Sequence, residues 1–142
     1  MTTADVRALS QADIVSLTTT QAAALETTFI SGLSSTQVGY LETADLAKLA
    51  TGTLNALVAS QLPGLKAAQV TALSSTQVEA LTSSFVGSLS VDQVKAISSS
   101  NVGALTTSNV VGLTTAQIAS LSNAQASKLT TAALNVLSTD KF

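Results

Sequence analysis

An eight-residue phrase repeats through the whole chain without losing register, and it limits the possible folds more than any other feature. The phrase reads Leu, two residues that are mostly Ser or Thr, any residue, an amide or acid, an aliphatic residue, any residue, and a small residue. At every eighth position from Met1, 16 of 18 residues are Leu, with Met1 and Ile97 as the exceptions. Such self-similarity is typical of a repeat array, in which each unit packs on its neighbours. We therefore interpret residues 1–142 as a single array of about 18 octads.

Each octad has the pattern of a helix start, as the segment from Leu113 to Ser120 illustrates. Thr114 fits the N-cap position, where a hydroxyl accepts a hydrogen bond from an unpaired backbone N–H. Gln117 follows three residues later and completes a capping box, while Leu113 and Ile118 occupy the two positions of a hydrophobic staple. The pattern predicts a helix of about five to seven residues in each octad, beginning just after the Leu.

Helices this short are unstable alone, because nucleation costs more than a few hydrogen bonds give back. The predicted fold class is therefore all-α, a solenoid of stacked one-to-two-turn helices with one helix per octad. A continuous helix is disfavoured, because the Leu column would rotate by about 80° per octad and spiral around the outside. A β-solenoid is the alternative, although columns five and three residues apart fall on opposite faces of a strand.

The pattern weakens at an irregular junction near residues 50–66. The N-cap position there holds Ala50, Val58 and Lys66, none of which can cap a helix as Ser or Thr does. Good helical spacing over 53–62 predicts that two octads fuse into one longer helix, which Pro63 and the following glycine then end. We favour a drifted repeat here over a kink between two arms.

Three aromatic residues depart from the octad. Phe29 and Phe85 replace the usual Gln at the fifth position, and Tyr40 replaces the small eighth residue. An exposed aromatic side chain marks a contact surface in some proteins, but a lone one more often fills a local gap. We favour the gap-filling interpretation.

Both ends of the chain keep the apolar pattern. Met1 fits the Leu column and Phe142 fits the aliphatic column, so we expect each end to present unpaired apolar surface. Solenoids without polar capping units tend to associate end to end. The sequence therefore predicts a homo-oligomer or a head-to-tail filament.

Composition excludes several functional classes. Cys and His are absent, which removes disulfides and the commonest general base and metal ligand. The net charge is −2 with six scattered Lys and Arg, so no basic footprint for nucleic acid exists. No apolar run approaches the length of a membrane span, and the first residues already fit the repeat, so we expect no signal peptide. We identify no catalytic, cofactor-binding or metal-ligating residues and expect no cofactor.

Phrases such as Leu113-Thr114-Thr115-Ala116-Gln117-Ile118 resemble the LTTAQIxAL repeats of large bacterial secreted or surface proteins. The resemblance covers the whole chain and implies an extracellular or cell-surface, adhesin-like or filament-like role without naming a ligand. The Leu-Thr-x-x-Gln-Val start is also similar to the first helix of TAL-effector repeats. The period of eight, with no second helix and no base-reading loop, argues against DNA recognition.

The sequence thus predicts a non-enzymatic structural module, acting as a spacer, an adhesin or a self-assembling filament subunit. The alternative is a binding module whose regular Ser and Thr surface recognises a periodic ligand, a glycan or ice. A flat outward-facing Thr column would favour that alternative, whereas the capping interpretation commits one hydroxyl per octad to a helix N-terminus.

Overall fold

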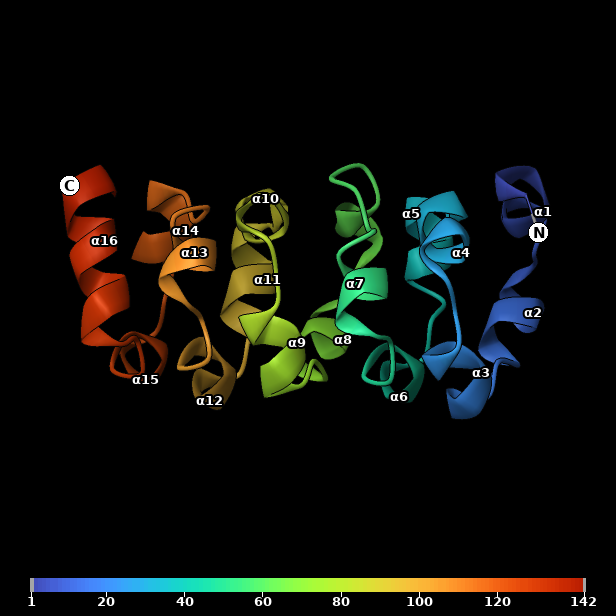
Figure 1. Ribbon diagram of the computed structural model, residues 1–142, viewed down its shortest axis with the longest axis horizontal. Coiled ribbons are helices and arrows are strands. Elements are labelled where there is room, and N and C mark those ends of the chain that lie inside the picture. Colours follow the sequence, from blue (N-terminus) through green and yellow to red (C-terminus); the bar gives the residue numbers. More distant parts are fainter. Residues whose placement is uncertain (1, 142) are drawn as a thin grey trace.

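Short helices follow one another along the chain and stack into an elongated rod (Figure 1). The computed structural model describes residues 2–141, with side chains described as far as residue 138. No strand occurs in that part of the chain, so the all-α solenoid is confirmed and the β-solenoid is not. The helices are α1 (Thr3–Arg7), α2 (Gln11–Val15), α3 (Thr19–Ala23), α4 (Thr27–Gly32), α5 (Ser35–Val38), α6 (Thr43–Leu46), α7 (Thr51–Leu54), η1 (Leu62–Gly64), α8 (Ala67–Thr71), α9 (Ser75–Glu79), α10 (Ser83–Ser88), α11 (Val91–Ala96), α12 (Ser99–Val102), α13 (Thr107–Val110), α14 (Thr115–Ala119), α15 (Asn123–Ala126) and α16 (Thr131–Lys141).

The predicted capping box forms in most octads. In α14, the hydroxyl of Thr114 accepts from the backbone N–H of Gln117 at 3.2 Å, and Gln117 Oε1 accepts from the N–H of Thr114 at 2.7 Å. Ser or Thr builds the same box at α1, α2, α3, α5, α9, α11 and α15. Because the capping residue directly follows the Leu, the helix begins two residues after it. Most helices are four to six residues long, slightly shorter than predicted.

Three octads complete one turn of the solenoid. Helix α1 packs on α4, α10 on α13, and α12 on α15, so each helix contacts the one three octads further along. The chain therefore returns to the same side of the rod every 24 residues. The Leu and aliphatic columns of all three sides point inward and form one continuous core.

The core columns change at the two ends of the rod. Leu9, Leu17 and Leu25 in the first turn are only half-buried, because no described turn lies behind them. At the other end α16 continues for 11 residues through the expected corner, and it buries Leu137 while leaving Leu134 47% exposed. The prediction that Leu134 lies in the buried aliphatic column is therefore wrong. Met1 and Phe142, predicted as column residues, lie outside the described residues.

The fused helix predicted over 53–62 does not form. Helix α7 ends at Leu54, and the chain then turns and enters the short 3₁₀ helix η1 at Leu62. The corner is held because Gln61 accepts from the N–H of Val58 at 2.8 Å. Leu57 remains buried beside Leu62, so the register of the octads continues through residues 50–66.

Glycines allow very close approach between turns on the side of the rod formed by α5, η1, α10 and α13. A Cβ atom added to Gly64 would fall on the carbonyl oxygen of Ser35, and one added to Gly112 would fall on that of Ser83. The small eighth residue was predicted to allow close approach between successive octads. The contact is instead with the octad one full turn earlier.

We predict that Gly112→Ala and Gly52→Ala change stability in opposite directions. Gly112→Ala forces the turns apart and should cost about 1–3 kcal/mol or more, as overpacked cores do. Gly52 lies in α7 with nothing within 4 Å of an added Cβ. There, alanine should stabilise the helix by roughly 0.5–1 kcal/mol. Urea unfolding of both variants measures the difference, and equal effects at the two sites would contradict the close approach.

Candidate functional site

The residues at the fifth position of the octads form a column of buried polar side chains, which we term the glutamine column. From the second turn onward its glutamines are 2–6% exposed: Gln37, Gln61, Gln69, Gln77, Gln93, Gln117 and Gln125. We predicted a surface rich in hydroxyls and amides, but these amides lie inside the rod. Burying an amide without hydrogen bonds costs several kcal/mol, so each of them needs partners.

Gln77 shows how one side chain meets this requirement. Its Oε1 accepts from the backbone N–H of Ser74 at 3.0 Å, which closes the N-terminus of its own helix. Its Nε2 donates to the carbonyl oxygens of Leu46 and Leu49, both at 2.9 Å. Those carbonyls stand at the C-terminal end of α6, one turn of the solenoid earlier, where a helix leaves acceptors without partners. One amide therefore caps two helices from successive turns.

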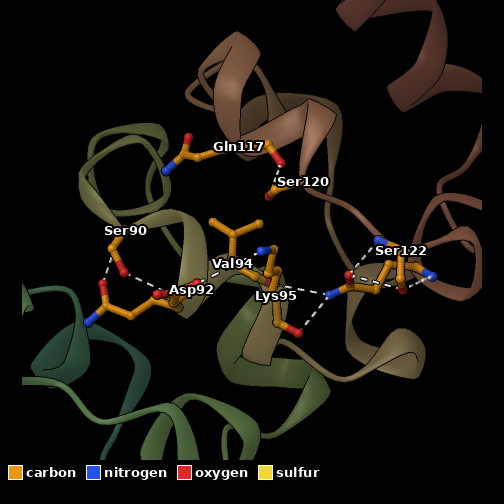
Figure 2. Close-up of polar contacts among 9 residues, drawn as sticks. Ser90, Asp92, Val94, Lys95, Gln117, Ser120 and Ser122 are labelled. Carbon is orange, nitrogen blue, oxygen red and sulfur yellow. Dashed lines mark hydrogen bonds and ion pairs between the residues drawn. The ribbon is translucent and has the colours of Figure 1, made fainter.

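The same two donor contacts recur along the rod with constant sequence separations. The glutamine Nε2 reaches the carbonyls 31 and 28 residues earlier, at distances of 2.6–3.1 Å, from Gln37, Gln61, Gln69, Gln93, Gln117 and Gln125. Figure 2 shows one such corner, in which the segment capped by Ser122 lies against Val94 and Lys95 at the end of α11. The surface ion pair between Lys95 and Asp92, at 3.9 Å, is exposed and contributes little.

Shorter side chains in the column make fewer of these bonds. Asn101 donates to the carbonyl of Leu73 at 2.6 Å, and Thr53 donates to that of Leu25 at 3.1 Å. Neither α7 nor α12 has a complete capping box. Asn109 also donates backward, but its Oδ1 is buried without a partner. Glutamine is therefore the residue whose length and chemistry satisfy both helices at once.

The aromatic replacements belong to the core. Phe85 is 4% exposed within the core, and Phe29 and Tyr40 are half-buried against it. The gap-filling interpretation is therefore confirmed. A shallow hollow opens beside Tyr40, with Glu42 and Lys66 on its rim. Among the described residues, no three His, Cys, Asp or Glu side chains gather where they could hold a metal ion. No described helix is long and apolar enough to cross a membrane.

Asp45 is the one carboxylic acid buried within the described column. It is 1% exposed, and its Oδ2 has no hydrogen-bond partner. The capping box predicted for it is absent. By the spacing of the column, its side chain faces the carbonyls of Ile14 and Leu17, to which a carboxylate cannot donate. Burial, with a smaller contribution from the neighbouring Glu42, raises the pKa of Asp45.

The acids of the first turn behave differently at the same octad position. Asp5 accepts from the N–H and hydroxyl of Thr2 at 2.7 and 2.8 Å, and Asp13 accepts from those of Ser10, both at 2.8 Å. These bonds lower the pKa of both carboxyl groups. Both side chains are exposed, because no described turn lies behind them. Their predicted capping role is confirmed.

These features define the chain as a three-sided α-solenoid whose turns are joined by side-chain amides. The model of the ALTTAQ repeat family matches residues 38–75 and 94–131, more than half of the chain, and the chain belongs to that family. No curated protein and no solved structure matches the chain significantly. The resemblance inferred from the Leu-Thr-Thr-Ala-Gln phrase is thereby confirmed.

We predict that Gln77→Leu destabilises the chain more than Gln21→Leu. The first change leaves the N–H of Ser74 and two carbonyls of the earlier turn without their partner and should cost about 1–3 kcal/mol. Gln21 closes only its own capping box and is exposed. Its replacement should cost roughly 0.5–1 kcal/mol. Denaturant unfolding compares the two, and losses of equal size would show that the backward bonds of Gln77 contribute nothing.

We predict that Asp45 makes stability depend on pH. Because its pKa is raised in the folded state, the stabilising proton is bound below the unfolded value, near 3.8, and is lost as pH rises through the folded pKa. Relative to an Asp45→Asn variant, the wild-type chain should therefore lose stability between pH 4 and neutrality. Asp92→Asn, an exposed control, should follow the wild type. A wild-type-to-Asp45→Asn difference that stays constant across this range would contradict the prediction.

Proposed function

We propose that this chain is a non-enzymatic structural module, a stiff spacer within a bacterial surface or secreted protein. The observation that carries the proposal is the glutamine column, because the buried amides are committed to joining one turn to the next. Such a column fixes the spacing of the turns along the whole rod. The exposed surface offers mainly hydroxyls and scattered charges. The extracellular location follows from the resemblance to repeats of secreted and surface proteins.

Capping consumes many of the surface hydroxyls. The Ser or Thr that follows the Leu accepts a backbone N–H in ten of the described helices, among them those capped by Ser34, Ser74 and Thr114. A hydroxyl held in this way is less available to an outside ligand. This arrangement supports the spacer more than a recognition surface.

One observation favours the alternative of a ligand-binding module. On the side of the rod formed by α1, α4, α7, α9 and α12, the first helical residue of each octad carries an outward hydroxyl, from Thr3, Thr27, Thr51, Ser75 and Ser99. These residues recur once per turn and lie outside the capping position. A column of this kind suits a weak periodic ligand such as a glycan or ice.

A spacer must hold its ends at a fixed distance, and this provides the test. The chain has no cysteine, so Thr3→Cys and Ser138→Cys, both at exposed positions, accept a donor and an acceptor dye without other changes. We predict a narrow distribution of dye distances that glycans or ice do not alter. Deleting residues 73–96, one complete turn, should shorten that distance without loss of helix.

Two outcomes would contradict the proposal. A broad distance distribution would show that the rod is not stiff enough to act as a spacer. Saturable binding of a glycan, or inhibition of ice recrystallisation, that is lost in a Thr27→Lys/Thr51→Lys variant would favour the recognition surface instead.

A further inference from the structure

The C-terminal end of the rod presents acceptors that the glutamine column uses everywhere else. By the 31- and 28-residue spacing, the carbonyls of Ile118 and Leu121 form one acceptor pair, and those of Ala126 and Leu129 form the next. No glutamine of the described chain donates to either pair. Apolar surface accompanies them, because Ile118 is half-exposed and Ala126 and Leu134 are exposed.

The N-terminal end presents the opposite half of the same joint. Leu9, Leu17 and Leu25 are half-exposed there, and their counterparts in the next turn, such as Leu33, are fully buried against the turn behind them. The apolar surfaces of the two ends therefore match, as they do between turns inside the rod. The polar column does not match, because its first two members are Asp5 and Asp13.

The two carboxylates offer no hydrogen to a carbonyl oxygen. A second copy docked in the register of the repeat would bring Asp5 over Ile118 and Leu121, and Asp13 over Ala126 and Leu129. Both acids keep the half of the capping box that serves their own helix and lack the half that joins turns. Their hydrogen bonds to Thr2 and Ser10 lower the pKa of each, so the charges persist at neutral pH.

We propose that Asp5 and Asp13 prevent end-to-end stacking of this chain by placing carboxylates against the carbonyl pairs that a glutamine would engage. Docking would bury two charges against partial negative charges, without compensating hydrogen bonds. A partner that fits the C-terminal end is a similar repeat array whose first turn carries glutamine at these positions. The inference opposes the filament expected from the sequence, and it is independent of the spacer role.

The test converts the carboxylates to amides. Gln21 forms a complete capping box in the same turn, so an Asp5→Gln/Asp13→Gln variant should fold as the wild type does. Analytical ultracentrifugation should find the wild type monomeric and the variant associating with a dissociation constant at least about tenfold lower. Circular dichroism would confirm equal helix content.

Matched controls separate this effect from a change of net charge. Glu79→Gln/Asp92→Asn removes two exposed acids away from the ends and should stay monomeric. Adding Ala126→Asp to the Asp5→Gln/Asp13→Gln variant should restore the monomer, since Ala126 is exposed on the receiving end. A wild type that associates as strongly as the variant, or a variant as monomeric as the wild type, would overturn the inference.

Discussion

The rest of the structure depends on a side-chain amide that is bonded in two directions. A helix of four to six residues has nearly as many unpaired backbone groups at its ends as it has internal hydrogen bonds. In this chain the glutamine oxygen closes the N-terminus of its own helix, and the glutamine nitrogen closes the C-terminus of a helix one turn earlier. Helices too short to exist alone are thereby joined in series. The apolar columns supply the burial, and the amides fix the spacing.

The demands of this joint explain the other positions of the octad. A glutamine must reach the carbonyls 31 and 28 residues earlier, so successive turns must lie close together. Small residues at the eighth position permit that approach, and on one side only glycine fits, as Gly64 and Gly112 show. The Leu and aliphatic residues then meet those of the adjacent turns. Where the column lacks glutamine, as at Asp45 or Asn109, a buried polar atom is left without a partner.

Local features of the fold were predictable from sequence, because they depend on residues within one octad. The caps at Thr114 and Ser74, the staple and the two apolar columns all follow from neighbouring residues. The number of octads per turn did not follow, because it depends on partners 28 and 31 residues away. Asp13 and Asp45 show the same limit. They share one octad position, but the first is exposed and hydrogen-bonded, whereas the second is buried behind a complete turn. In α16, no later described turn engages the helix end, and the helix continues through the expected corner.

Hydrogen exchange of the glutamine side-chain amides tests this account most directly. Nuclear magnetic resonance can follow the Nε2 protons of Gln77, Gln93 and Gln117, whose nitrogens donate to carbonyls inside the rod. Gln11 and Gln21 are exposed in the first turn and serve as references within the same molecule. We predict that the interior amides exchange far more slowly than the two references. Equal exchange rates at all five side chains would contradict the claim that the glutamine column joins the turns.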